Sequence, residues 1–202
     1  MIKAELEKKE GKRRRTVPKE LIYEMRNGSP IYYRNYDKVL SGEKSLEEVM
    51  GISKIQSIVI FCLLEILYKN LNLDKYIILT NEVGFQYSKK SWRNLDIGIF
   101  DKRKLLEDPV KDKYTTIPPE VVIEIDTKAD LRKFSSPQEY FHRKTQDLLD
   151  SGVKKVIWIF TKERKIWLAE KGKRWTITDW NNTIEIIDNI RLNLDTELSS
   201  LL

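Results

Sequence analysis

Cysteine and histidine are almost absent from this 202-residue chain, because Cys62 and His142 are the only residues of their types. A single cysteine excludes a disulfide framework within the chain and a zinc site built from several cysteines. A single histidine argues against a nuclease that binds its metal through histidines, and against a Ser-His-Asp hydrolase. We interpret Cys62 as a core residue and His142 as a residue of a helix surface.

Several sequence signals of other protein classes are also missing. No apolar run reaches 18 residues, so we expect no membrane-spanning helix. The chain has no Gly-rich phosphate loop and no Gly-x-Ser-x-Gly motif, which argues against a nucleotide-triphosphate enzyme and an α/β serine hydrolase. The first 15 residues are highly charged and lack the apolar core of a secretory signal, so we expect a cytoplasmic protein.

The composition is that of a globular protein with a basic excess. Hydrophobic residues make up 41% of the chain, enough for one compact domain with a core, which we assign to residues 18–202. Residues 1–17 contain the basic run Lys12–Arg15, and we interpret them as a flexible arm that binds phosphates or as a solvated tail. The formal net charge of +6 favours an anionic partner.

The hydrophobic pattern changes between helical and strand-like periods along the chain. Apolar residues at helical spacing predict helices over residues 53–70 and 138–151, with Ser45 and Ser53 as N-caps. Strand-like patterns occupy residues 31–33, 76–80, 83–87, 95–100, 121–126, 153–160, 164–169, 174–178 and 184–187. This order predicts a protein of the α/β (α+β) class, with a mixed sheet flanked by helices.

The most informative segment begins at Pro118 and ends at Lys128. If the strand alternates as usual, Glu124, Asp126 and Lys128 share one face, opposite three apolar side chains that enter the core. Two acids and a lysine are poor strand formers and are costly to bury. A divalent cation that binds carboxylate oxygens compensates for this cost, and a nearby lysine suits phosphate chemistry.

Three further residues extend this pattern. Asp96 interrupts an apolar strand, Glu82 lies between two strand-like runs, and Lys144 lies on or beside the apolar face of its helix. Each residue also has an ordinary explanation, as an acid at an exposed strand end, a surface turn residue or a snorkelling lysine. The combination of an acid on one strand, an acid-x-acid-x-lysine array and a helix lysine indicates a functional site.

In this order of residues the chain resembles the PD-(D/E)XK nuclease superfamily, which has the restriction-endonuclease-like fold. The similarity covers roughly residues 23–187. Asp96 matches the first acid of the motif, with Leu95 where the family usually has proline. Asp126-Thr127-Lys128 matches the acid-x-lysine spelling. The alternative register, in which the lysine has moved to the helix, resembles an uncharacterised branch of the superfamily, through Val121–Ile125, Lys144, Gly152-Val153 and Ile157–Ile159.

The resemblance implies a metal-dependent endonuclease that hydrolyses phosphodiester bonds in DNA and forms a homodimer. In the register that we favour, Asp96 and Glu124 bind Mg²⁺, or Mn²⁺ in its place, and Lys144 is the migrated lysine. Glu82 is then an auxiliary acid of the metal site. Asp126 and Lys128 remain the alternative catalytic residues.

A different class of function is a nucleic-acid-binding module on the same fold that has no catalytic activity. The basic arm, Lys89-Lys90 and Arg93 would bind the backbone, and Tyr87 and Trp92 would stack on bases. Aromatic residues of this kind are more often ordinary members of the core or of the surface.

Overall fold

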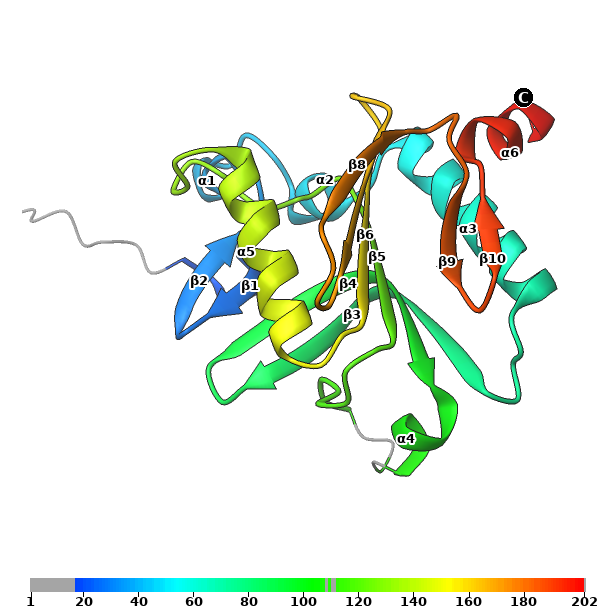
Figure 1. Ribbon diagram of the computed structural model, residues 1–202. Coiled ribbons are helices and arrows are strands. Elements are labelled where there is room, and N and C mark those ends of the chain that lie inside the picture. Colours follow the sequence, from blue (N-terminus) through cyan, green and yellow to red (C-terminus); the bar gives the residue numbers. More distant parts are fainter. Residues whose placement is uncertain (1–16, 108, 110–111, 202) are drawn as a thin grey trace, which may run out of the picture.

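The computed structural model of this chain describes residues 17–107, 109 and 112–201, so most of the predicted basic arm lies outside the described residues. A large mixed sheet runs through the molecule, with helices on both of its faces (Figure 1). The predicted class, a mixed sheet flanked by helices, is confirmed. Within the described residues, no helix combines the length and the apolar character that crossing a membrane requires.

The elements follow one another in an order close to the predicted one. They are the 3-10 turn η1 (Lys19–Leu21), β1 (Ile22–Arg26), β2 (Ser29–Tyr32), α1 (Tyr36–Ser41), α2 (Leu46–Met50), α3 (Lys54–Asn70), β3 (Tyr76–Ser88), β4 (Ser91–Asp101), α4 (Lys102–Glu107), β5 (Val121–Ile125), α5 (Pro137–Asp150), β6 (Lys155–Phe160), β7 (Lys165–Glu170), β8 (Thr176–Asp179), β9 (Ile184–Ile187), β10 (Ile190–Leu192) and α6 (Leu194–Leu201).

The strands of the large sheet lie in the order β2-β1-β4-β5-β6-β7-β8, and β3 pairs with the other edge of β4. Strands β5 and β6 are parallel, and α5 connects them, as a parallel pair requires. The neighbouring pairs β4–β5 and β6–β7 are antiparallel. The parallel pair therefore lies in the middle of the sheet, with its carboxyl ends at one edge.

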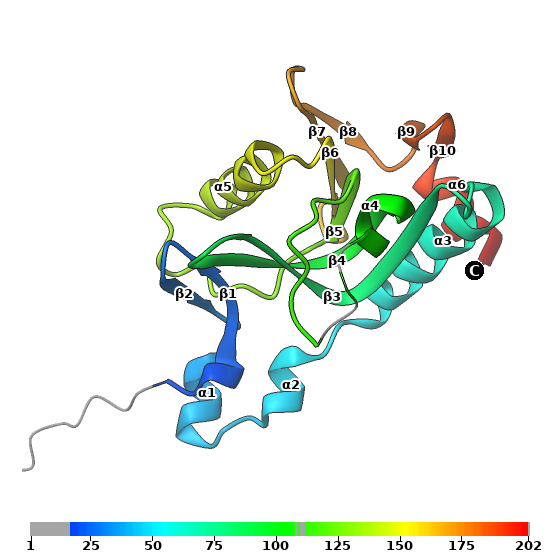
Figure 2. The same ribbon diagram turned by 90° about the horizontal axis from the view of Figure 1, so that it is seen from below.

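The sheet separates two hydrophobic cores. Helix α3 packs its apolar stripe on one face, and Cys62 is buried there as predicted. Helix α5 covers the other face, where Tyr140 and Trp158 are buried. Figure 2 shows these two helices on opposite sides of β4, β5 and β6. Strand β5 contributes to both cores, because Ile123 faces α3 and Val122 faces α5.

The helix starts follow the sequence signals. Ser45 and Ser53 both form capping boxes, in which the serine side chain accepts from a backbone amide and the side chain three residues on accepts from the serine amide. Ser136 caps α5 by accepting a hydrogen bond from the amide of Glu139. These caps fix the first turns of helices α3 and α5 at the edge where β5 and β6 end.

The predicted strand limits were wrong in several places. Strand β1 and the short strand β10 were not predicted, and β2 begins before the predicted strand at residue 31. Residues 76–88 form one long strand with a bulge, in place of two separate strands. Strand β5 ends at Ile125, so Asp126 lies outside it.

Candidate active site

A gap between two strands positions the candidate site. Strand β3 pairs along one edge of β4, so β1 and β5 share the other edge. Met25 of β1 pairs with Trp92, and Ile123 of β5 pairs with Ile97. Between these two contacts, no strand in the described part of the chain pairs with β4 on that edge. Side chains from β1, β4, β5 and α5 fill this gap.

Asp96 and Glu124 lie side by side in this gap. The register of β4 and β5 places Ile97 opposite Ile123, so Asp96 and Glu124 occupy the next pair of positions. The backbone amide of Ile125 donates a hydrogen bond of 2.8 Å to Oδ2 of Asp96. This bond links the Asp96 carboxylate to the residue that follows Glu124. The two residues that the sequence predicted as metal ligands are therefore neighbours.

A bulge in β3 lies opposite Asp96 and brings Glu82 to the site. Asn81 and Glu82 have positive φ angles of 72° and 56°, and they are inserted between the pairs Thr80–Ile97 and Val83–Leu95. Bulges of this kind bend a strand and change the direction of a side chain. Glu82 accepts a hydrogen bond of 2.9 Å from the hydroxyl of Tyr33 and forms an ion pair with Lys128.

Lys144 is completely buried beneath Glu124. Its Nζ lies 2.8 Å from Glu124 Oε2, 2.8 Å from Glu24 Oε1 and 2.8 Å from the carbonyl oxygen of Asn94. The ammonium group donates hydrogen bonds to Glu124 and to the carbonyl oxygen of Asn94, whereas Glu24 Oε1 is an ion-pair partner without a hydrogen bond. Burial alone would lower the pKa of Lys144, but Glu124 and Glu24 hold it above its ordinary value. Lys144 is therefore a cation that fixes the position of Glu124.

Glu24 is a residue of this site that was not predicted from the sequence. It is fully buried on β1, and its carboxylate lies against Lys144, Arg93 and the hydroxyl of Tyr140. The signal that identifies it is Asn27-Gly28, a typical turn of a two-residue hairpin. A strand before that turn, pairing with the predicted strand after it, places Glu24 in the sheet.

Arg93 continues the buried ion network away from the site. It pairs with Glu24 at 2.6 Å and with Asp147 at 2.6 Å, and Asp147 also pairs with Arg26. Burial opposes ionisation of Asp147, but hydrogen bonds from Arg26 and Arg93 hold its pKa below the ordinary value. The predicted role of Arg93 in holding a nucleic-acid backbone is wrong, because its side chain is only 1% exposed. Lys89 and Lys90 remain exposed at the β3–β4 turn.

The charges of this network leave one carboxylate without a cation. Glu24, Glu124 and Asp147 each lie in an ion pair with Arg93, Lys144 or Arg26. Among the described residues, Asp96 forms no ion pair, and Glu124 Oε1 is buried without a hydrogen-bond partner. An unpaired buried carboxylate oxygen beside an unneutralised carboxylate is costly. The pair therefore fits a hard divalent cation bound by oxygen atoms.

The ionisation of the two carboxyl groups agrees with this description. Burial raises the pKa of Asp96 to about 6, although the amide of Ile125 and the charge of Lys144 oppose the rise. Burial also raises the pKa of Glu124 well above its ordinary value, Lys144 opposes this rise, and the charge of Asp96 adds to it. A bound cation favours the ionised form of both groups.

The expected alternation of Glu124, Asp126 and Lys128 was wrong. Asp126 has a positive φ of 54°, which ends the strand and breaks the alternation. Its carboxylate accepts hydrogen bonds of 2.9 Å and 2.6 Å from the amide and hydroxyl of Thr161, at the end of β6. Lys128 instead turns to Glu82 and to the carbonyl oxygen of Met50, and its side chain is 12% exposed. Asp126 therefore points away from Glu124.

The described residues offer no third side-chain ligand beside Asp96 and Glu124. Within residues 17–107, 109 and 112–201, no three His, Cys, Asp or Glu side chains converge closely enough to hold a metal. His142 is exposed and packs against the ring of Trp175, with a centroid distance of 4.7 Å. A cation at Asp96 and Glu124 would therefore complete its coordination with water or substrate oxygens.

The fold is similar to that of a crystal structure from Anabaena variabilis ATCC 29413, described as "a putative nuclease belonging to DUF820". The TM-score is 0.64, the sequence identity is 15%, and the similarity covers 89% of this chain and 90% of that one. No protein-family model and no curated protein matches this chain. At this identity the comparison establishes a shared fold alone.

Proposed function

We propose that this protein is a metal-dependent nuclease that hydrolyses phosphodiester bonds in DNA. The observation that carries the proposal is the pairing of Asp96 with Glu124, whose Oε1 is buried without a hydrogen-bond partner. The description of the structural neighbour as a nuclease and the net charge of +6 support it. This is the function that the resemblance to the PD-(D/E)XK superfamily implies.

In this proposal Asp96 and Glu124 hold Mg²⁺, with Mn²⁺ as a substitute, and Glu82 is an auxiliary acid. When bound, the ion would supply Lewis-acid chemistry, polarising the scissile phosphate and making water more acidic. Lys144 holds Glu124 in place through Oε2 and leaves Oε1 available. Lys128, on the more accessible side, adds positive charge where an anionic phosphate would approach.

The test compares the wild type with Asp96→Asn and Glu124→Gln, which remove one charge each and keep the side-chain shape. Plasmid and oligonucleotide DNA are incubated with Mg²⁺, Mn²⁺ or EDTA, and Mn²⁺ binding is measured by calorimetry. We expect cleavage and Mn²⁺ binding in the wild type, and a loss of at least about 100-fold in either variant. Asp74→Asn is the matched control, because it removes the charge of an exposed aspartate in the turn between α3 and β3.

Intact DNA in all conditions, together with no Mn²⁺ binding, would rule out the nuclease. Binding of DNA that persists in EDTA without cleavage would instead favour the non-catalytic binding module. Parallel RNA substrates test the assignment of DNA. The proposed homodimer is tested by analytical ultracentrifugation, where a monomer at assay concentration would contradict it.

A further inference from the structure

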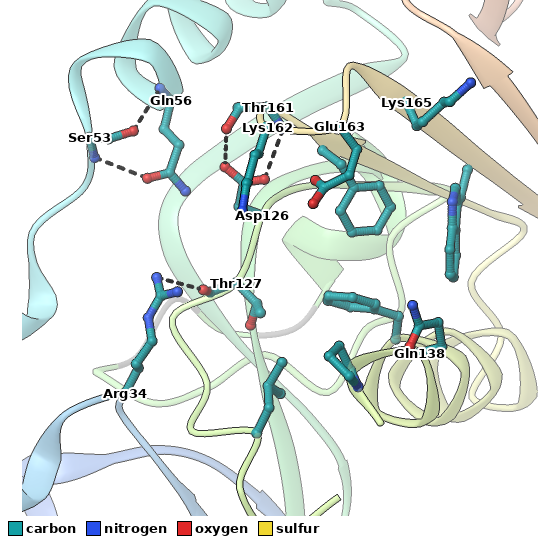
Figure 3. Close-up of a pocket in the computed structure, with 15 residues that line it drawn as sticks. Arg34, Ser53, Gln56, Asp126, Thr127, Gln138, Thr161, Lys162, Glu163 and Lys165 are labelled. Carbon is teal, nitrogen blue, oxygen red and sulfur yellow. Dashed lines mark hydrogen bonds between the residues drawn. The ribbon is translucent and has the colours of Figure 1, made fainter. Parts of the chain in front are cut away.

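A pocket of about 480 Å³ opens at the carboxyl ends of β5 and β6, next to the candidate active site (Figure 3). The first turns of α3 and α5 border it, through Gln56 and Gln138. Neither Asp96 nor Glu124 lines it. Its volume lies within the range of pockets that bind small organic groups.

Aromatic side chains form one wall of this pocket. Phe141 of α5, Phe160 of β6 and Trp167 of β7 line it together. The rings of Phe141 and Trp167 meet edge to face, with centroids 5.9 Å apart, and Phe160 lies 5.1 Å from Trp167. Phe141 and Trp167 are only half-buried, so parts of their rings are open to the pocket. Such a wall suits a flat aromatic ligand.

Cations and amides border the same pocket. Arg34 and Lys162 supply positive charge, against the acids Asp126 and Glu163, while Lys165 at the border pairs with Asp179. Asp126 already accepts two hydrogen bonds from Thr161, as Figure 3 shows. Among the described residues, no ion pair engages the exposed Lys162. An anionic group of a ligand can therefore pair with Lys162, beside the aromatic wall.

One short segment joins the pocket to the metal-binding carboxylates. Glu124 is two residues before Asp126, so their Cα atoms lie at most about 7 Å apart. Asp126 and Thr127 line the pocket, and the next residue, Lys128, pairs with Glu82 on the other side of the segment. A nucleic-acid strand with its phosphate at Asp96 and Glu124 would therefore carry its neighbouring nucleotide past the pocket.

We propose that this pocket binds one unpaired nucleobase of the substrate strand, stacked on Trp167 and Phe141, beside the phosphate that is cleaved. The inference rests on the proposed nuclease function and extends it to a substrate with a single-stranded or flipped-out base. The amide of Gln138 offers a donor and an acceptor to the edge of a base. Arg34 and Lys162 would contact the adjoining phosphates.

The test measures DNA binding in EDTA by fluorescence anisotropy, so that it does not depend on cleavage. The probes are a single-stranded oligonucleotide, the same strand with an abasic residue at each position in turn, its duplex and the free mononucleotide. We expect one abasic position to weaken wild-type binding about 5- to 100-fold, which is the size of one stacking contact. The duplex and the mononucleotide should bind more weakly than the single strand.

Trp167→Ala should bind the intact and abasic strands equally, both as weakly as the wild type binds the abasic strand. Trp167→Phe keeps a ring and should retain most of the difference, which separates stacking from misfolding. The control is Trp175→Ala, which truncates a half-buried tryptophan outside the pocket and should behave as the wild type.

Two results would overturn the pocket assignment: a wild type that binds intact and abasic strands equally, or a Trp167→Ala variant that still distinguishes them. If the free mononucleotide binds more tightly than the strand, the pocket serves a small ligand and the assignment to the substrate strand is wrong. A normal binding result without any cleavage by the wild type would instead contradict the nuclease and leave the base pocket standing.

Discussion

At Asp96 the proposed role, binding a cation, opposes the stability of the fold. Its carboxylate is partly buried, and among the described residues no cationic side chain pairs with it. Functional sites commonly contain such destabilising groups. The destabilising effect of Asp96 should be measurable in the protein without a bound cation.

We therefore expect Asp96→Asn to stabilise the metal-free protein. The raised pKa means that the unfolded state favours the ionised carboxyl, so the carboxylate destabilises the fold above pH 6. A rise of the pKa from 3.8 to about 6 corresponds to a loss of roughly 3 kcal/mol in the free energy of unfolding. Because Asp96 is partly exposed, we expect a loss of about 1–2 kcal/mol. Urea unfolding in EDTA at pH 8 measures the gain, which should shrink to zero as the pH falls to about 4. A less stable variant at pH 8 would contradict the assignment.

Lys144 should be far more important for stability than a surface lysine. Lys144→Met leaves Glu24 and Glu124 buried without their shared cation, which should cost about 3–5 kcal/mol. The control is Lys69→Met, which breaks an exposed ion pair with Glu65 and should cost less than about 0.5 kcal/mol. Denaturant titration measures both. Adding Glu124→Gln to Lys144→Met should recover part of the loss, and equal costs for the two lysines would refute the buried pairing.

The sequence predicted Asp96, Glu124 and Lys144, because polar residues within apolar patterns are visible in one dimension. Glu24 was not predicted because its strand is only five residues long and shows no clear alternation of apolar and polar residues. Asp126 was misplaced because its left-handed backbone cannot be read from residue type. The position of a charged side chain can be predicted where the hydrophobic period is clear, but not where a strand ends.

Strand β3 is covered by the segment that precedes β5. The amide of Thr115 donates to the carbonyl oxygen of Gly84, and Tyr114 lies directly over Gly84. A Cβ atom at position 84 would collide with the ring of Tyr114. Tyr114 in turn packs against Trp92, with a centroid distance of 5.0 Å. Glycine is therefore needed here for the close approach of the ring.

Gly84→Ala should destabilise the protein by about 1–3 kcal/mol, because the ring of Tyr114 must move. In the background of Tyr114→Ala the same change should cost less than about 1 kcal/mol, since the collision is gone. Thermal and urea unfolding of the four proteins in this cycle measure the coupling. Additive effects of the two changes would show that the ring does not rest on Gly84 in solution.

The elements with strong local signals were predicted well. Helices α3 and α5 have long apolar periods and serine caps, and they begin within one residue of their predicted starts. Strand β3 was divided in two because Asn81-Glu82 has the composition of a turn, whereas the structure uses these residues as a bulge. Strand β1 pairs mainly with β2 through the Asn27-Gly28 turn, so the turn was recognised but the strand before it was not.

The proposed binding of a cation by the folded protein should depend on pH. Protons compete with the cation for Asp96 below its pKa of about 6, so Mn²⁺ affinity should fall about tenfold for each pH unit below that value. The raised pKa of Glu124 adds a second competing proton and steepens the dependence. Calorimetric titrations with Mn²⁺ between pH 5 and pH 8 test this. Equal affinity at both ends of the range would exclude these two carboxylates as the ligands.

The two halves of the chain contribute different parts of the site. Glu24, Glu82 and Asp96 precede α4, whereas Glu124, Lys128 and Lys144 follow it. A chain divided between α4 and β5 would leave each fragment with one of the paired carboxylates. Recovery of the proposed metal binding on mixing such fragments would then report their reassociation, so the chain is suited to a split-protein complementation assay.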